Sequence, residues 1–378
     1  MSLQNKIAAE VKRLGFTLFG VTVPGAPPHF NVYESWIKQG RHGGMGYLAT
    51  ERAMSRRSDP GLILPGCKSI LVLGWPHLIP NLPVQNLESE SYRLTGRIAS
   101  YAWDEDYHEV IPRKMNQLVD FIEQQVGGKI PNRWYTDTGP ILERDLAQQA
   151  GLGWIGKNSC LINPGSGSYF LLAELFLGIK LEADQPFSAD RCGSCTRCIQ
   201  ACPTGCIIGD RTIDASRCIS YLTIELKGAI PVELRPQIQN WVFGCDICQQ
   251  VCPWNQRFAA PTESIQVDVH LAQLELISEL ALSPQAFNIK FKGSPVKRTK
   301  RRGYLRNVAV ALGNSGSTSG VPRLIETLKN DQEPLVRGHA AWALGRIGNQ
   351  QARYALETAL SYEHDPYVLE EIHSGLGG

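Results

Sequence analysis

The sequence predicts a multidomain α/β or α+β protein, and three patterns carry that prediction. Residues 1–180 alternate apolar segments typical of strands with helical patterns. Nine of the eleven cysteines lie within 192–252, and eight of these follow a metal-binding spacing. The tail repeats itself with a period of 32 residues. A chain of 378 residues also exceeds one ordinary core, so several domains are expected.

The first 180 residues are expected to form a sheet with helices against it. Two apolar runs, 69–74 and 169–173, favour strands, and the pattern over 109–125 favours an amphipathic helix. The alternation of the two kinds of segment predicts that some strands pair in parallel. The run 169–179 is too short for a membrane span, which needs about 20 apolar residues.

The cysteines between 185 and 257 follow the spacing of two-cluster ferredoxins. The first run is C-x2-C-x2-C-x3-C-P, and the second is C-x2-C-x3-C-P with one cysteine displaced 27 residues ahead of it. In such ferredoxins the last cysteine of each run ligates the other cluster. We therefore assign one [4Fe-4S] cluster to Cys192, Cys195, Cys198 and Cys252, and the other to Cys202, Cys218, Cys245 and Cys248.

Zinc binding and disulfide formation are two other possible roles of these cysteines. Paired CxxC motifs also hold zinc, but zinc does not require this spacing twice. The N-terminus shows no secretory signal, which argues against a disulfide framework. Cys67, Cys160 and Cys206 lie outside the pattern and are expected to be small buried apolar residues.

The tail is expected to form HEAT-like helical repeats. AVALG at 309–313 recurs as AWALG at 341–345, Gly316 maps to Gly348, and Glu333-Pro334 maps to 365–366. About two and a half units are present; the alternative is a plain helical cap. The predicted domains are 1–180, 181–260, a linker over 261–300, and the repeats over 301–378.

A glycine motif at 151–156 satisfies GxGxxG but is not expected to bind a dinucleotide. Such a motif must follow a strand and open a helix. Here it follows the amphipathic pattern 141–150, which indicates a helix that ends at a glycine.

A basic run lies between the linker and the repeats. Residues 290–306 hold eight Lys or Arg and no acid, with Phe291 and Tyr304 among them. This composition suits phosphate contacts and base stacking, although a charge run is often only a solvated face. The candidate RNA contacts are Lys297, Arg298, Lys300, Arg301, Arg302 and Arg306.

Several segments together resemble epoxyqueuosine reductase, the cobalamin-dependent enzyme family that completes queuosine at the wobble position of the tRNA anticodon. They are DEDYH at 104–108, DTGPILER at 137–144, GLGWIGKNS at 151–159, RCISYLTIE at 217–225 and LRNVAVALGN at 305–314, with the split cysteine pattern. The resemblance implies a nitroreductase-like cobalamin-binding domain, a ferredoxin-like module and a HEAT-like tail. It also implies reduction of epoxyqueuosine in tRNA, with cobalamin reduced through the two clusters.

The resemblance gives Asp137 the role of proton donor to the epoxide oxygen. From the residues alone, Asp137 could equally be a helix N-cap or a turn residue ahead of Pro140. The cobalamin contacts that the resemblance suggests are Arg57, Tyr101, His108, Lys157, Asn158, Ser159, Ser168, Glu174, Ser220, Tyr221 and Asp246.

Two other functions remain open on the sequence. The chain could be an iron–sulfur electron-transfer protein, or a reductive dehalogenase-like cobalamin enzyme that acts on small molecules. For the leading hypothesis we expect tRNA and an external low-potential electron donor as partners. We also expect a cytoplasmic monomer without a membrane segment.

Overall fold

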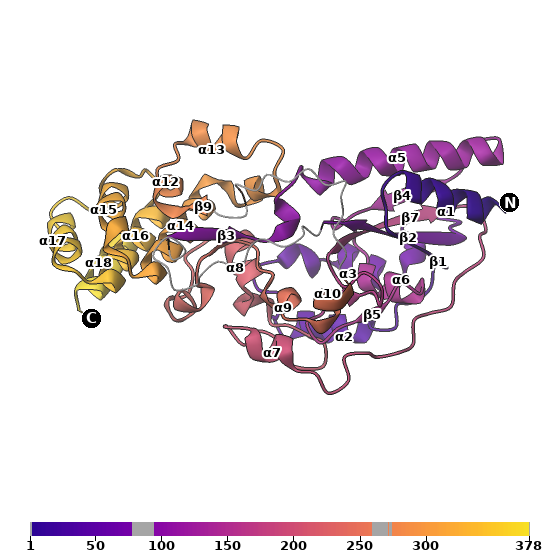
Figure 1. The fold of residues 1–378 in the computed structure, drawn as a ribbon, viewed down its shortest axis with the longest axis horizontal. Helices are drawn as coiled ribbons and strands as arrows, with labels where there is room; N and C mark the ends of the chain where they lie inside the picture. The colour runs from indigo at the N-terminus through magenta and orange to yellow at the C-terminus, as the bar shows by residue number, and fades with distance from the viewer. Residues whose placement is uncertain (1, 78–93, 259–270, 272–273, 378) are drawn as a thin grey trace. The chain divides into compact units, whose positions relative to one another are not determined.

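The computed structural model describes residues 2–77, 94–258, 271 and 274–377, which form two compact units (Figure 1). Unit 1 combines 1–80, 106–216 and 247–265, and unit 2 combines 81–105, 217–246 and 266–378. The boundaries predicted from the sequence stay predictions, and the first ten residues of the predicted linker lie outside the described residues. No helix in the described ranges is long and apolar enough to cross a membrane.

Unit 1 is built on a four-stranded sheet in the order β1-β2-β7-β4. Its strands are β1 (Leu18–Thr22), β2 (Ser69–Pro76), β4 (Asn132–Tyr135) and β7 (Phe170–Leu177). Both predicted strands are confirmed as the two central strands. Every pair in this sheet is antiparallel, so the predicted parallel pairing is wrong here. Strands joined through long helical segments can still run antiparallel, and the alternation pattern does not distinguish the two cases.

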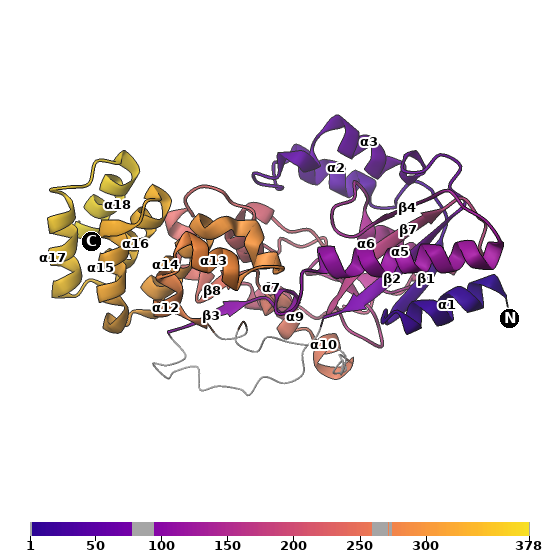
Figure 2. The same cartoon turned by 90° about the horizontal axis from the view of Figure 1, so that it is seen from above.

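Helices lie against this sheet. The predicted helix is α5 (Tyr107–Val126), which packs beside α1 (Leu3–Arg13), as Figure 2 shows. The short helix α6 (Glu143–Gln149) packs on β1, β2 and β7, where Leu146 and Ala147 join the core. Gly151 follows α6 with φ of +76°, so the predicted glycine end of this helix is confirmed.

The rest of unit 1 consists of short elements. They are α2 (Phe30–Lys38), α3 (Glu51–Ser58), the hairpin β5 (Trp154–Ile155) and β6 (Leu161–Ile162), α7 (Arg197–Ala201), α9 (Ile247–Gln250) and α10 (Pro253–Phe258). The glycine motif runs into β5, where a Cβ added at Gly153 would collide with the Ile162 carbonyl oxygen. Gly153 therefore allows two backbones to approach each other closely.

Unit 2 begins with a small sheet in the order β8-β3-β9. Strand β3 (Thr95–Ile98) pairs in parallel with β8 (Trp241–Phe243) and antiparallel with β9 (Leu274–Glu275). The helices α8 (Ile219–Ile224), α12 (Leu276–Leu280) and α13 (Pro284–Lys290) complete this part. The described parts of both units also contain short 3₁₀ helices, at Gly46–Leu48, Pro60–Leu62, Ser100–Ala102, Ala215–Arg217, Val232–Leu234, Pro236–Ile238, Pro295–Thr299 and Thr318–Gly320.

The remainder of unit 2 is the repeat array, and the predicted period is confirmed helix by helix. Its helices are α14 (Lys300–Ser315), α15 (Val321–Asn330), α16 (Pro334–Ile347), α17 (Gln350–Ala359) and α18 (Pro366–Leu376). Gly316 and Gly348 end α14 and α16 with the same φ of +65°. Pro334 and Pro366 each open a helix directly after an acidic residue. Equivalent sequence positions thus occupy equivalent structural positions.

The repeat helices cross at glycines. A Cβ added at Gly313 would lie 2.9 Å from the Cα atom of Ala343. A Cβ added at Gly345 would lie 2.5 Å from the Cα atom of Gly375. Real Cβ atoms do not approach backbone this closely, so each glycine permits its helix to pack against the next helix of the array (α14 on α16, α16 on α18).

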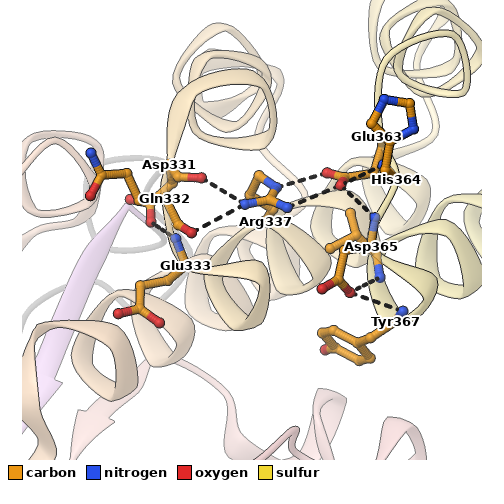
Figure 3. A network of polar contacts seen from close by, with 9 residues as sticks. Asp331, Gln332, Glu333, Arg337, Glu363, His364, Asp365 and Tyr367 are labelled. Atoms are coloured by element: carbon orange, nitrogen blue, oxygen red, sulfur yellow. Dashed lines mark hydrogen bonds and ion pairs between the residues drawn. The ribbon is translucent and has the colours of Figure 1, made fainter.

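A buried ion pair joins successive repeats. Figure 3 shows Arg337 between Asp331 and Glu363, and its guanidinium bonds both oxygens of Glu363 at 2.7 and 3.0 Å. The same guanidinium donates to the Asp331 carbonyl at 2.9 Å. Burial raises the pKa of Glu363, but Arg337 and two backbone N–H groups outweigh it and bring the pKa to about 2. The loops between repeats are therefore held by a fully hydrogen-bonded carboxylate.

Candidate functional site

Asp137 lies on a strained turn between β4 and α6. Its φ is +57°, and the Thr138 N–H donates to the Thr136 carbonyl at 2.5 Å, which makes a γ-turn centred on Asp137. The Thr136 hydroxyl fixes the start of this turn by donating to the Leu172 carbonyl on β7 at 2.8 Å. Left-handed backbone at a residue other than glycine costs about 1–3 kcal/mol and is concentrated at functional sites. The alternative that Asp137 caps a helix is wrong, because the residue at the N-cap of α6 is Leu142.

Two aromatic side chains from the start of α5 reach the Asp137 carboxylate. The Tyr107 hydroxyl donates to Oδ2 at 2.9 Å. The Nε2 atom of His108 lies 3.6 Å from the same oxygen, which is longer than a hydrogen bond. A hydrogen bond with Asp106 at 2.9 Å, followed by the interaction with Asp137, raises the pKa of His108 to about 9. The Asp137 side chain is 54% exposed, so it is oriented by protein groups and open on one side.

Two further carboxyl groups, those of Glu143 and Glu174, lie near Asp137. The Oε1 atom of Glu143, the first residue of α6, accepts the Asp137 N–H at 2.7 Å. Loss of hydration, and then the charge of Asp137, raises the pKa of Glu143 to about 7. Glu174 on β7 is fully buried, and neither of its oxygens has a hydrogen-bond partner among the described residues. Burial, and then the charges of Glu143 and Asp137, raises the pKa of Glu174 well above its usual value. Glu174 was predicted to contact cobalamin, and its complete burial contradicts that prediction.

Arg57 supports the turn rather than facing outward. Its guanidinium donates to the carbonyls of Gly139 and Ala53 at 3.4 Å each, and it stacks on the Tyr33 ring. Gly139 has no room for a side chain, because a Cβ there would lie 2.7 Å from the Tyr135 ring. Arg57 therefore holds the segment that carries Asp137.

Unit 1 brings the first cysteine run and Cys252 together. Burial, and then the neighbouring thiols of Cys192 and Cys252, raises the pKa of Cys198. The indole N–H of Trp154 donates to the Sγ atom of Cys192 at 3.4 Å, and Trp154 shares a small core with Cys252. Cys195 follows in the same loop, with its N–H bonded to the Cys192 carbonyl at 3.0 Å. This grouping is the one that the ferredoxin crossover requires.

Cys202 has a neighbour that the sequence pattern left out. Its Sγ atom lies 3.4 Å from that of Cys206, and this contact lowers the pKa of Cys202 to about 5. Of the three cysteines outside the pattern, Cys206 is buried as expected, whereas Cys67 and Cys160 are only partly buried. In the described ranges, no group of three or more His, Cys, Asp or Glu side chains has the geometry to hold a single metal ion.

The GLGWIGKNS segment packs against the cysteine loops. The Lys157 ammonium donates to the carbonyls of Gly193 and Cys195 at 2.7 and 3.0 Å. Asn158 bonds the Cys248 carbonyl at 3.5 Å, and the Ser159 hydroxyl donates to the Arg211 carbonyl. The side chains predicted to contact cobalamin here are therefore engaged with the protein and position the loops around the cysteines.

The other predicted cobalamin contacts fall into two groups. Ser168 is buried, and its hydroxyl bonds Gln249 at 2.9 Å; Asp246 is buried and accepts the Ser100 N–H at 2.7 Å. Tyr221 is also buried on α8. Tyr101, His108 and Ser220 are partly exposed residues, although the Nε2 atom of His108 is itself buried.

The basic run divides into exposed and structural cations. Lys297, Arg298, Lys300 and Arg302 are exposed, and Arg298 also pairs with Glu225 at 2.6 Å. Arg301 pairs with Asp331 at 2.5 Å. An open pocket of about 410 Å³ is lined by Pro284, Lys300, Arg301, Arg302, Gln332 and Glu333.

The prediction that Arg306 contacts RNA is wrong. Its side chain is fully buried and donates to the carbonyls of Leu222, Leu226 and Gly228 at 2.6–2.8 Å. Arg306 therefore ties the first repeat helix to the segment after α8. The sequence did not reveal this role, because Arg306 lies within a run of basic residues.

The sequence reasoning missed Tyr107 and Glu143. Both lie inside segments that were singled out, DEDYH and DTGPILER. The signal that could have found them is the number of titratable side chains in each short segment, since perturbed groups gather at functional sites.

Comparisons with known proteins agree with this geometry. Three family profiles match, described as "Epoxyqueuosine reductase QueG, DUF1730" over 57–138, "4Fe-4S double cluster binding domain" over 191–255, and "HEAT repeats" over 302–377. An epoxyqueuosine reductase of Pseudomonas aeruginosa is 40% identical over 339 residues, which is 89% of this chain and 92% of the relative. One from Escherichia coli is 37% identical over 350 residues, with 90% of each chain covered.

Solved structures are similar over nearly the whole chain. An epoxyqueuosine reductase bound to an epoxyqueuosine-modified tRNA-Tyr stem loop superposes with a TM-score of 0.89 at 32% identity and covers 99% of this chain and 98% of its own. An epoxyqueuosine reductase from Bacillus subtilis, captured with its catalytic aspartate loop swung out of the active site, gives a TM-score of 0.88 at 32% identity with the same coverage.

Proposed function

The chain belongs to the epoxyqueuosine reductase family, and from this premise we propose that it reduces epoxyqueuosine to queuosine at the wobble position of tRNA, with Asp137 as the proton donor. One observation carries the proposal: a half-exposed carboxyl on a strained turn, oriented by Tyr107, in a chain similar throughout to a reductase solved with the modified stem loop. The catalytic aspartate loop of the Bacillus subtilis relative supports the same assignment.

The reaction removes one oxygen atom from an epoxide. Two C–O bonds break, a C=C bond forms, two electrons enter, and the oxygen leaves as water after taking two protons. Asp137 delivers a proton to the oxygen as the first C–O bond breaks, because an alkoxide is a poor leaving group. The Tyr107 hydroxyl donates to Oδ2 at 2.9 Å and so orients the carboxyl group.

The residues of unit 1 fit an iron–sulfur cluster. Its cysteines supply the thiolates that a [4Fe-4S] cluster requires, and the Trp154 N–H stabilises the charge on Cys192 Sγ. We assign the two clusters to the cysteine sets given by the spacing. When bound, these clusters supply single low-potential electrons, which we propose come from an external donor.

The proposed cobalamin contacts are reduced to three. Tyr101, His108 and Ser220 are partly exposed residues, and we propose them as contacts to the amides and phosphate of this cofactor. When bound, cobalamin supplies a strongly reducing cobalt centre for the C–O bond. The donor set by itself would not identify this cofactor, and the proposal draws on the family.

For the substrate, we propose that Lys297, Arg298, Lys300 and Arg302 contact tRNA phosphates, since these predicted contacts are exposed. We further propose that the protein acts as a monomer in the cytoplasm, where tRNA is found.

The test uses anaerobically prepared full-length protein. Reconstituted protein should contain about eight irons per chain. With cobalamin and a chemical reductant it should remove one oxygen from an epoxyqueuosine-containing stem loop, as followed by mass spectrometry, and without cobalamin it should not. Stoichiometric zinc in place of iron, or electron transfer without any loss of oxygen, would instead support a zinc protein or a simple electron carrier.

A further inference from the structure

The proposed reaction needs more protons than Asp137 can hold. Each turnover places two protons on one oxygen, and one carboxyl carries one proton. The second proton must reach the same oxygen after Asp137 has become a carboxylate. That proton comes either from solvent on the exposed side of Asp137 or from a group within reach of it.

We propose that Glu143 is a second proton donor, which returns a proton to Asp137 within the same turnover. This inference rests on the function proposed above. The O–H bond of Glu143 breaks, an O–H bond forms on Asp137, and Asp137 passes this proton to the departing hydroxyl, which leaves as water. The two electrons come from the external reductant of the proposed reaction, and solvent protonates both carboxylates afterwards.

The geometry places Glu143 against the Asp137 turn. Glu143 opens α6, and its Oε1 atom accepts the Asp137 N–H at 2.7 Å. A carboxyl that accepts with one oxygen can carry its proton on the other. The hydrogen bond also ties the acid to the backbone of the residue it serves.

The surroundings keep Glu143 in its acid form near neutral pH. The cations near it are Arg57 and Arg144, and both are engaged with carbonyls, those of Ala53 and Gly139 for Arg57 and that of Ser159 for Arg144. The carboxyl neighbours are Asp137 and, from β7, Glu174. Loss of hydration and the Asp137 charge raise the pKa of Glu143 to about 7, against the opposing effects of the hydrogen bond from the Asp137 N–H and of the two arginines.

Glu174 is an uncharged neighbour of Glu143 and Asp137. It pairs with Val72 and Tyr135 on the neighbouring strands, is fully buried, and has no hydrogen-bond partner among the described residues. Ionising such a carboxyl would cost several kcal/mol, so it stays protonated. The sheet therefore offers no positive charge that would favour ionised Glu143.

His108 is the competing donor, and it is less suitable. Its Nε2 atom lies 3.6 Å from Asp137 Oδ2, which is longer than a hydrogen bond. Its pKa is raised to about 9 by Asp106 and Asp137, whereas that of Glu143 is about 7. Glu143 thus releases a proton about a hundred times more readily, since two pKa units are a factor of 10². His108 instead provides a fixed positive charge beside Asp137.

The test measures single-turnover oxygen removal by the holoenzyme between about pH 6 and pH 8.5. Wild-type rates should fall as pH rises through about 7, because the acid form of Glu143 is required. Glu143→Gln should slow the reaction about 10²-fold and lose this inflection. Glu143→Asp should keep the inflection at a reduced rate, which shows that a carboxyl is needed. Glu123→Gln on α5 serves as control: that carboxyl binds Lys129 and the Ile130 N–H, and rate and inflection should be unchanged.

A second readout does not depend on turnover. Infrared difference spectra of the full chain between pH 6 and pH 8 should show loss of a protonated carboxyl band, absent from Glu143→Gln and present in Glu123→Gln. A wild-type rate and inflection in Glu143→Gln would overturn the inference, as would an unchanged infrared band. If Asp137→Asn is inactive while Glu143→Gln is fully active, only the second donor is wrong. If Asp137→Asn is fully active, the proposed function of Asp137 is wrong instead.

Discussion

Four carboxyl groups, two in each unit, lie in opposite kinds of surroundings. In the repeats of unit 2, Glu363 and Glu371 each accept hydrogen bonds from an arginine on both carboxylate oxygens. In unit 1, Glu174 on β7 is buried and has no hydrogen-bond partner among the described residues, and Glu143 at the start of α6 accepts the Asp137 N–H. The carboxylates bonded to arginine carry a fixed negative charge, whereas Glu174 and Glu143 hold a proton. Burial alone therefore does not reveal the role of a carboxyl; its hydrogen-bond donors do.

The largest effect is expected on the reaction rate when Asp137 in unit 1 is changed. Asp137→Asn keeps the size of the side chain and its contact with Tyr107 but cannot deliver a proton. We expect the single-turnover rate to fall by about 10²–10⁴ while iron content and cobalamin binding remain. Because Asp137 does not cap α6, stability should change little. A fully active variant would remove the distinction between the two units.

Loss of an arginine partner in unit 2 is expected to lower the stability of the protein instead. Arg235 is 1% exposed and bonds both oxygens of Glu371 at 2.5 and 2.7 Å. Arg235→Ala leaves a buried carboxylate unpaired, and the free energy of unfolding should drop by about 3–5 kcal/mol in denaturant titrations. Arg353→Ala, an exposed position in the same array, should cost less than about 0.5 kcal/mol. Equal effects of the two changes would contradict the structural role.

The two kinds of carboxyl should give stability opposite slopes against pH. The pKa of Glu363 falls to about 2 in the folded state, so its stabilisation is present above pH 4.5 and is lost as pH falls from 4.5 to 2. The full effect is about 3 kcal/mol. The pKa of Glu174 is raised, so its contribution turns unfavourable as pH rises above 4.5.

Thermal unfolding measured over a range of pH separates the contributions of Glu363 and Glu174 to stability. Glu363→Gln should flatten the acid limb, and Glu174→Gln should flatten the decline on the alkaline side. If both variants flatten the same limb, one of the two assignments is reversed.

The smallest effect concerns the exposed part of the basic run. Lys300→Ala with Arg302→Ala should weaken stem-loop binding a few-fold. The slope of log K against log salt should become shallower by up to about 0.9 for each phosphate that the protein no longer neutralises. Lys329→Ala, an exposed lysine outside the run, should leave affinity unchanged. Unchanged binding in the double variant at moderate salt would make the run a solvated face.

The sequence predicted features that repeat or follow fixed spacing. Gly316 and Gly348 marked the period, and both end a helix at the same dihedral angle. The ferredoxin spacing grouped Cys252 with the first run, and the core around Trp154 supports that grouping. Such patterns work because each residue type is dictated by local geometry.

What the sequence missed depends on partners that are distant in the chain. Arg306 reads as one cation of a basic run until its three carbonyl partners are seen 78–84 residues away. Lys157 reads as a cofactor contact until its ammonium is found on the cysteine loop. The antiparallel sheet was missed for the same reason, since strand direction is set by long-range pairing.

The glycine crossings of the repeat array also bear on how its length can change. At Gly313 and Gly345 one backbone rests on the next, so the spacing between units is set by the main chain and not by particular side chains. Insertion or deletion of one whole 32-residue unit would preserve that spacing, whereas a partial unit would bring a Cβ into the crossing. The tail can therefore grow or shrink in evolution only in whole steps, and a designer who wished to extend its surface would have to copy the glycine with each added unit.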